Sequence, residues 1–354
     1  MATPTNRQLP VELYNIFIRE LSTVELHAMS LASHWTNQIA TPLLYQRIVF
    51  QRSTRLDVVT SLLHTLLNRM DLSMLVQHLV LAWTGQSDQI SNINANLRTV
   101  LPKLVNLQHL TVFRSLEIHT EIFDHVTLPK LRHFHYFAAD ESIFAFFNRH
   151  PRLQTVTTCS PREYSFRHWG FDLEMICLWN GGGVDVLRFF ADEETRPALR
   201  RIDWIRGGDA ATMTALAVRF PNVRQINYLT QNTLAGDFFG VQWPSVRRVG
   251  RVVDPTVLRS DCDLLLRFTT RALARFPNMQ TLDIIFQHTA QLSQQDLIVV
   301  DEAVRLMYAV ENIQLVTAAG HAYLRDPGKS EFSSGALAES HHAPVIPWGL
   351  IIAY

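Results

Sequence analysis

A short string of hydrophobic and polar positions recurs along most of the chain. It is six residues long and reads apolar, Arg or Gln, any residue, apolar, any residue, apolar or polar. Apolar residues at positions one, four and six suit a strand that is buried on one face. Clear copies begin at Val76, Leu107, Leu131, Leu153, Leu199, Val223, Val246 and Met279, and a fainter copy begins at Ile313.

The spacing of the strings indicates a repeat protein. Successive copies start 22 to 34 residues apart, except for an interval of 46 residues between Leu153 and Leu199. That interval has the length of two short units, and residues 171–176 lie where a degenerate copy would fall. Units of about 20–29 residues that each carry a short strand are typical of leucine-rich repeats, and longer intervals accommodate longer return helices.

Helices are predicted between the strands. Apolar residues at helical spacing lie ahead of several strings, in residues 142–149, 212–219 and 264–275, and Ser293 with Asp296 predicts a capping box ahead of residues 297–310. A proline ahead of a string marks the end of a helix, because it disfavours helix at the preceding residue. Such prolines are Pro129, Pro151, Pro197, Pro221, Pro244 and Pro277. We therefore predict an α/β fold over residues 51–320, a leucine-rich-repeat-like solenoid with a curved parallel sheet inside and helices outside.

The first fifty residues follow a helical pattern instead. Pro10 suits a first helical turn, and apolar residues at helical spacing continue to Leu21. Ser22 can cap a second helix that carries Glu25 in its first turn, where a carboxylate meets the positive end of the helix dipole. A third helical stretch runs through Trp35 to residue 45. Residues 1–50 are thus predicted to form a compact helical module.

The order of residues in this module resembles the F-box. The residues that carry the resemblance are Leu9-Pro10-x-Glu12-Leu13, Leu21-Ser22, Glu25-Leu26, Leu31-Ala32-Ser33, Trp35 and Leu44-Tyr45. The chain departs from the family at Ala32, where valine is usual, and at Glu25, where aspartate is more common. With the repeats behind it, the chain resembles F-box proteins with irregular leucine-rich repeats, the fungal type of F-box substrate receptor.

The resemblance implies a function and two kinds of partner. Receptors of this family are substrate-recognition subunits of cullin-based, SCF-type ubiquitin ligases: the F-box docks on a Skp-type adaptor and the repeats bind a target protein. The residues implied at the adaptor are Leu9, Pro10, Leu13, Ile16, Leu21, Leu26 and Leu31, with Trp35 mainly structural. Two alternatives stay open. The helices can be a plain cap on the first repeat, and the protein can be a repeat scaffold that never engages the adaptor.

The target is expected on the face that carries positions two, three and five of the strings, because successive strand residues point to opposite faces. Arginines recur there, and arginine and tryptophan are enriched among residues that dominate binding. A row of arginines suits an acidic or phosphorylated segment. The alternatives are a solvated polar face and neutralisation by carboxylates such as Asp192, Glu193 and Glu194. The predicted target-binding residues are Arg200, Arg201, Asp203, Trp204, Arg224, Arg247 and Arg248.

Composition narrows the class of protein. The 354 residues are 47% hydrophobic, with 32 basic and 32 acidic side chains, so we expect an ordered chain without the positive field that nucleic acid requires. The N-terminus lacks a secretory signal, and no membrane span is expected. The cysteines Cys159, Cys177 and Cys262 are read as core thiols of a cytoplasmic or nuclear protein.

Catalytic and cofactor motifs are missing from the sequence, so we expect neither an enzyme nor a cofactor. His78, His109, His133 and His135 suggest a metal site. Cysteine and carboxylate residues do not occur at the spacing that further metal ligands would need, and this favours a solvated or hydrogen-bonded histidine cluster instead. Residues 181–183 are glycines and are read as a flexible turn, without the lysine or the strand-to-helix context of a phosphate loop.

Residues 321–354 are predicted to be a tail. Asp326-Pro327-Gly328 and Ser333-Ser334-Gly335 are turn-forming runs that favour a mobile segment, and the apolar end, residues 345–354, can fold back as a cap.

Overall fold

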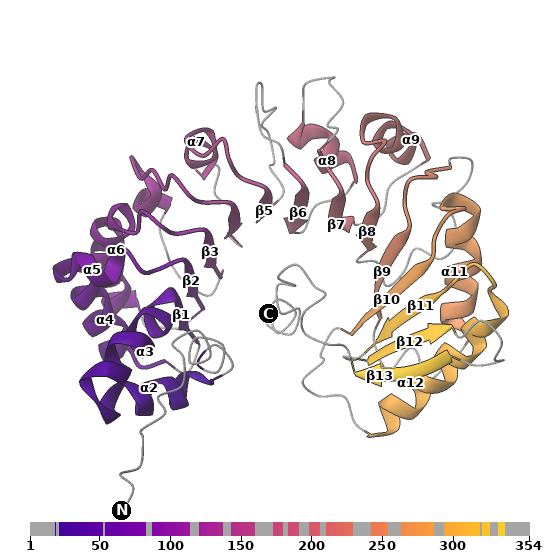
Figure 1. Ribbon diagram of the computed structural model, residues 1–354. Coiled ribbons are helices and arrows are strands. Elements are labelled where there is room, and N and C mark those ends of the chain that lie inside the picture. Colours follow the sequence, from indigo (N-terminus) through magenta and orange to yellow (C-terminus); the bar gives the residue numbers. More distant parts are fainter. Residues whose placement is uncertain are drawn as a thin grey trace, which may run out of the picture. The chain divides into compact units, whose positions relative to one another are not determined.

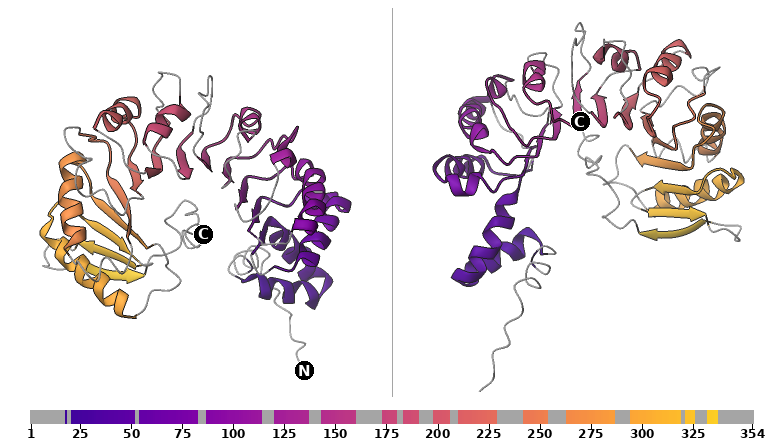
Figure 2. Two further views of the ribbon diagram at one scale, coloured as in Figure 1. Left: turned by 180° about the vertical axis from the view of Figure 1, so that it is seen from behind. Right: turned by 45° about the horizontal axis from the view of Figure 1, so that its top comes forward.

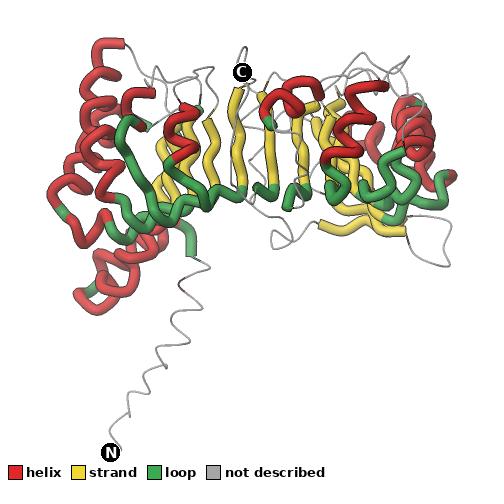
Figure 3. Tube along the Cα trace, turned by 90° about the horizontal axis from the view of Figure 1, so that it is seen from above, coloured by secondary structure: helices red, strands yellow, loops and turns green. Residues whose placement is uncertain are grey.

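A computed structural model describes residues 18, 21–51, 54–82, 87–113, 120–136, 143–159, 173–179, 183–190, 198–205, 210–228, 242–253, 263–286, 294–318, 321–325 and 332–336. The chain divides into two compact units, Met1–Leu153 and Gln154–Tyr354. Each unit is an α/β structure in which neighbouring strands follow the order of the sequence. The helices that connect the strands cover one face of each sheet, and the opposite face carries none of the described helices (Figure 1 and Figure 3).

The first unit begins with a helix pair and continues into parallel strands. Strand β1 pairs with β2, β2 with β3 and β3 with β4, all in parallel. Figure 2 shows the indigo helix pair as a lobe at the β1 end of this sheet. The described elements are α2 (Thr23–Ala32), α3 (His34–Gln46), β1 (Arg47–Phe50), α4 (Leu56–Asn68), α5 (Met70–Ser73), β2 (His78–Leu81), α6 (Ser87–Val100), η1 (Leu101–Lys103), β3 (His109–Val112), η2 (Thr120–Phe123), β4 (His133–Tyr136) and α7 (Ile143–Asn148).

The second unit repeats the same pattern and ends in a hairpin. Strands β5 to β11 pair in parallel, and β12 and β13 are added antiparallel. Its described elements are β5 (Thr155–Cys159), β6 (Met175–Trp179), α8 (Gly183–Phe189), β7 (Arg201–Ile205), α9 (Ala210–Arg219), β8 (Gln225–Tyr228), β9 (Arg248–Val253), α11 (Leu264–Arg275), β10 (Thr281–Phe286), α12 (Gln294–Leu306), η4 (Met307–Ala309), β11 (Leu315–Ala318), β12 (His321–Arg325) and β13 (Phe332–Ala336).

The core lies between each sheet and its helices, as the strings predict. In the string that begins at Leu107, positions one, four and six are Leu107, Leu110 and Val112, and all three side chains are buried. The helices bury one face against them: Val59, Leu63 and Leu66 of α4 are buried at helical spacing. The α/β class and the parallel sheet are therefore confirmed.

Backbone hydrogen bonds at position two hold neighbouring strings in register. The carbonyl of Arg200 accepts from the N–H of Arg224 at 2.8 Å and from that of Gln225 at 3.1 Å. The carbonyl of Gln77 does the same for Gln108 and His109. Equivalent pairs of bonds follow at Gln108, Gln154, Glu174, Arg224, Arg247 and Gln280. Residues at one string position therefore lie beside one another on neighbouring strands.

The structure shows one strand that the string search passed over, β1, and one that lies where a degenerate copy is expected, β6. Strand β1 pairs with β2 in register, with Arg47 opposite His78. Its string starts at Tyr45, so the last residues of the predicted helical module, 47–50, are a strand rather than a helix. The search missed it because Tyr45 is an amphipathic residue at the apolar position one. Strand β6 lies in the interval where a degenerate copy was expected, with Leu173 and Ile176 buried.

The predicted mobile tail is wrong for residues 321–325 and 332–336. They form the antiparallel hairpin β12–β13, in which Ser333 pairs with Leu324 and Gly335 with Ala322. The hairpin is anchored because Tyr323 is 7% exposed and donates a hydrogen bond from its hydroxyl to Asp301 Oδ1 at 2.7 Å. Residues 337–354, including the apolar end, lie outside the described residues.

We expect that Ile202→Asp unfolds the second unit. Ile202 is 0% exposed at position four of its string, and burying an unpaired carboxylate costs more than about 4 kcal/mol. Ala215→Asp, on the exposed side of α9, is the matched control and should cost roughly 0.5 kcal/mol. Urea unfolding followed by circular dichroism measures both; an Ile202→Asp protein as stable as the control would contradict the assigned register.

Candidate partner-binding surfaces

The helix pair α2–α3 is built by two capping boxes. Ser22 Oγ accepts from the N–H of Glu25 while the Glu25 carboxylate accepts from the N–H of Ser22 at 2.7 Å. Ser33 and Thr36 repeat the exchange at the start of α3. The hydrogen bonds from Ser22 lower the pKa of Glu25, so the carboxylate stays charged at the positive end of α2. The cap predicted at Ser22 is confirmed.

The pair has a small core of its own and an exposed apolar surface. Ile18, Leu26 and Ala40 are buried, with Leu21, Met29, Ile39, Leu43 and Leu44 packed around them. Three large apolar residues remain outside: Val24 is 78% exposed, Leu31 is 74% exposed and Trp35 is 43% exposed.

The residues predicted at the adaptor therefore separate into groups. Leu31 lies on the exposed surface and Leu21 is partly buried, whereas Leu26 is 8% exposed and fills the core. Leu26 belongs to the core because it points from α2 toward α3. Trp35, expected to be mainly structural, is substantially exposed. Leu9, Pro10, Leu13 and Ile16 lie outside the described residues.

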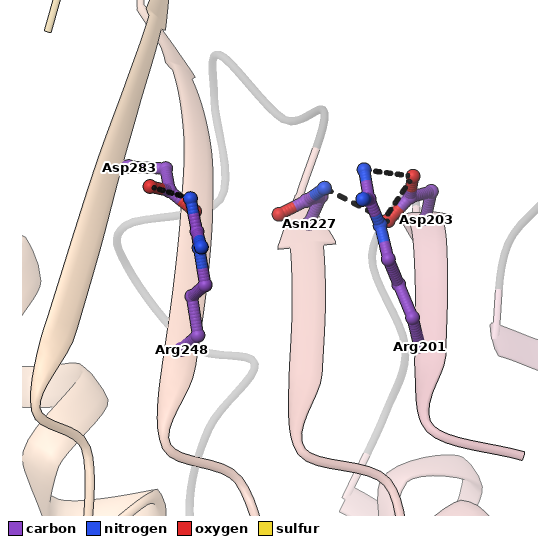
Figure 4. A network of polar contacts seen from close by, with 5 residues as sticks. All are labelled: Arg201, Asp203, Asn227, Arg248 and Asp283. Carbon is purple, nitrogen blue, oxygen red and sulfur yellow. Dashed lines mark hydrogen bonds and ion pairs between the residues drawn. The ribbon is translucent and has the colours of Figure 1, made fainter. Parts of the chain in front are cut away.

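A polar network lies on the second unit, on the face that carries positions three and five of the strings, which we call the open face (Figure 4). Arg201 Nη2 lies 2.7 Å from Asp203 Oδ2, and Arg201 Nε donates to Asp203 Oδ1 at 2.8 Å. Asn227 on the next strand donates from Nδ2 to Asp203 Oδ1 at 2.8 Å. On the strand after that, β9, Arg248 donates to Asp283 of β10 through Nε and, at 2.9 Å, through Nη2. In the second unit, the position-three arginines Arg201 and Arg248 are thus each neutralised by a position-five aspartate.

The Arg201–Asp203 pair is buried. The Asp203 side chain is 0% exposed and that of Arg201 is 17% exposed. Burial raises the pKa of Asp203, and the charge and hydrogen bonds of Arg201 oppose this shift. Taking two charges out of water is costly, so the geometry of three contacts from one guanidinium is what makes the pair tolerable. The charge of Arg201 is thus already paired with a buried carboxylate.

A second set of arginines, at position two, remains exposed. The backbones of Arg200, Arg224 and Arg247 are hydrogen-bonded in succession, Arg224 N–H to Arg200 O at 2.8 Å and Arg247 N–H to Arg224 O at 2.9 Å. All three side chains are exposed. We call these three residues the arginine row. Exposed Glu174 stands at position two on one side of the row and Gln280 on the other.

The predicted strip of five arginines is therefore two different features. Arg201 and Arg248 pair with Asp203 and Asp283, so the strip is partly neutralised. Asp192, Glu193 and Glu194 lie outside the described residues. The prediction missed this because a string shows which residues share a face but not that a position-three arginine can fold over to an aspartate at position five. Trp204 lies in β7, but its side chain is outside the described part.

A histidine stack occupies position three in the first unit. The rings of His78 and His109 are 4.1 Å apart with an interplanar angle of 10°, and those of His109 and His133 are 4.0 Å apart at 12°. The three side chains are partly buried, and His135 at position five is buried. Parallel register alone produces this arrangement, because His78, His109 and His133 are direct cross-strand partners. We call these three residues the histidine stack.

The stack is uncharged at neutral pH. Burial, followed by the charges of the neighbouring histidines, lowers the pKa of His109 to about 3, and burial with the charges of His78 and Arg132 lowers that of His133 to about 4. Burial and the charge of Arg47 also lower the pKa of His78. Like charges about 4 Å apart repel strongly, which is why neutral rings can stack where imidazolium rings cannot.

Other chemistry raised by the sequence has a structural setting. Among the described residues, no group of three or more His, Cys, Asp or Glu side chains is arranged to hold a metal ion. Cys177 is a buried free thiol, while the side chains of Cys159 and Cys262 are not described. The glycine run does have a strand-to-helix context, since it connects β6 to α8, and this corrects the expectation for residues 181–183. Within the described ranges, no helix is long and apolar enough to cross a membrane.

Neither a scan against protein-family models nor a search of curated proteins finds a match to this chain.

Arg201→Ala is expected to lower the free energy of unfolding by about 3 kcal/mol, because it leaves the Asp203 charge buried without its partner. The neighbouring change Arg200→Ala removes an exposed arginine and should cost less than about 0.5 kcal/mol. Denaturant titration of both variants measures the difference. Similar values for the two variants would show that Asp203 does not depend on Arg201.

Proposed function

We propose that the chain is the substrate-recognition subunit of a cullin-based, SCF-type ubiquitin ligase, acting in the cytoplasm or nucleus by binding rather than by catalysis. In this proposal the N-terminal helices are an F-box that docks on a Skp-type adaptor. The repeats are an irregular leucine-rich-repeat solenoid that binds a target protein. No cofactor is required for either role.

The observation that carries the proposal is the exposed apolar surface of the α2–α3 pair. The pair already fills its own core with Ile18, Leu26 and Ala40, so Val24 and Leu31 are not needed for folding. Each is more than 70% exposed, and exposed apolar side chains grouped on a small module suit a protein interface. The order of F-box-like residues along the same segment supports a Skp-type adaptor as the partner.

The arginine row supports an acidic or phosphorylated target segment. Its three guanidinium groups start from backbones about 4.8 Å apart, the spacing of parallel strands, and they are exposed. Arginine forks pair two-pronged with carboxylate or phosphate oxygens. Within the predicted strip, the arginine row is the part whose positive charge can bind an acidic segment. Arg201 and Arg248 at position three already pair with aspartates.

A second candidate function is a repeat scaffold that never contacts the ligase adaptor. The observation that favours it is the direct passage from α3 into β1: α3 ends at Gln46, whose carbonyl accepts the N–H of Gln77 in the next string. A helix pair joined in this way can serve as the cap that a terminal repeat needs. The adaptor experiment below separates the two functions.

Leu31→Gln is expected to reduce co-purification of a Skp-type adaptor at least tenfold without lowering stability, because the side chain is exposed and would lose its apolar contact only in the complex. Val58→Gln, at an exposed apolar position of α4, is the control and should bind normally. Changing both Leu9 and Pro10 to alanine should also reduce capture sharply. If the wild-type chain captures no adaptor, the scaffold function replaces the receptor.

Changing Arg200, Arg224 and Arg247 together to glutamate is expected to abolish capture of an acidic or phosphorylated target while adaptor capture is retained. The reversal of charge turns attraction into repulsion at three neighbouring positions. Affinity purification followed by mass spectrometry compares the two captures in one experiment. Arg188, Arg267 and Arg271 changed together to glutamate supply a control with the same charge difference on helices of the same unit. An unchanged target yield from the row variant would place the target elsewhere.

A further inference from the structure

The histidine stack and its surroundings carry a charge pattern that the proposed function does not use. On strands β1 to β4, string positions two to five contain Arg47, Arg132 and four histidines, and no aspartate or glutamate. Arg47 is exposed and is the direct cross-strand partner of His78. The open face of the first unit therefore carries Arg47 and a set of neutral but protonatable histidines, and Arg132 adds a further positive charge at position two.

We propose that the histidine stack, with Arg47 beside it, is a binding site for a tetrahedral dianion, such as a phosphorylated side chain of a protein partner, and that the site takes up a proton when it binds. The site lies on the first unit and does not depend on the arginine row or on the adaptor surface.

The geometry of the stack suits an anion with several acceptor oxygens. Rings 4.0 to 4.1 Å apart and nearly parallel turn their edges in a common direction. A neutral imidazole offers one N–H donor, and an imidazolium offers two. A phosphate group has three strong acceptor oxygens, so it can accept from adjacent ring edges and from the Arg47 guanidinium together.

The same geometry explains the coupling to a proton. In the free protein, burial is the largest cause that lowers the pKa values of the stack, and the charges of Arg47, Arg132 and the histidines themselves lower them further. Protonation of one ring would bring its charge close to these groups. A dianion supplies the missing opposite charge. Binding therefore favours the protonated ring, and by linkage acidification favours binding.

Inorganic sulfate is the probe of choice, because it stays a dianion from pH 5.5 to 7.5, whereas the phosphate group of a phosphorylated side chain titrates with a pKa of about 6. Binding is measured by isothermal titration at constant ionic strength in chloride, on a full chain in which Arg200, Arg224 and Arg247 are glutamine, so that the arginine row contributes nothing. Uptake of one proton predicts that the sulfate affinity rises about tenfold for each pH unit lowered. Two buffers of different ionisation enthalpy report the proton directly.

Variants then assign the effect to the stack. His109→Gln removes the central ring and should abolish the pH dependence, while Arg47→Gln should weaken binding at every pH and keep the pH slope. His64→Gln, at an exposed histidine of α4, is the control and should behave as the parent. Circular dichroism at each pH checks that every variant is folded.

A pH-independent affinity, or a slope that survives in His109→Gln, overturns the proposal. So does sulfate binding that is equally strong in Arg47→Gln and the parent. Because neither outcome involves an adaptor or a target, failure here leaves the proposed receptor function standing. Once sulfate binding is established, a phosphoserine peptide compared with its glutamate counterpart tests the source of the anion, and equal affinity for the two would remove the phosphate preference.

Discussion

The backbone carbonyl at string position two is the constraint on which the rest of the structure depends. It accepts two N–H groups from the following string, as Arg200 does from Arg224 and Gln225. A shift by one residue would break both bonds and would turn the buried positions four and six to the open face. Register is therefore held at the start of those described strands whose first residues donate to such a carbonyl. Chemistry on the open face follows from which residues this register places side by side.

This register places like residues in rows on neighbouring strands. Where the side chains of a row can carry the same charge, the structure must reduce the repulsion between them. The position-three arginines do so with aspartates at position five, and Asp203 is buried deeply enough that its carboxylate relies on Arg201 and Asn227. The position-three histidines do so by remaining neutral and stacking. The arginine row at position two is exposed, where water and salt screen neighbouring charges. The degree of burial thus determines which row keeps charged side chains that are accessible to a partner.

The repeating strands and their buried positions could be predicted from the sequence because each depends on local hydrophobic spacing. Leu107, Leu110 and Val112 reveal a buried face without reference to any other strand, and the Ser22–Glu25 capping box is complete within four residues. The pairing of Arg248 with Asp283 could not be predicted in this way, since the two residues are on different strands and meet only once the register is known. Strand β1 and the hairpin β12–β13 could not be predicted for a related reason. Tyr45 is a weak signal for the start of a string, and residues 333–335 have the sequence of a turn and form a strand only by pairing with β12.

The junction between α3 and β1 ties the helix pair to the first strand mechanically. Gln46 ends the helix, its carbonyl accepts the N–H of Gln77 at 2.9 Å, and its side-chain amide donates to Gln77 Oε1 at 3.0 Å. The chain therefore passes from helix into sheet with no intervening linker residue, since β1 begins at Arg47. A flexible linker would let two binding surfaces reorient independently, whereas here the last residue of α3 accepts a backbone hydrogen bond from Gln77, the residue before β2. A protein bound to the exposed side of α2–α3 would for this reason be held in a defined orientation to the first strands of the first unit.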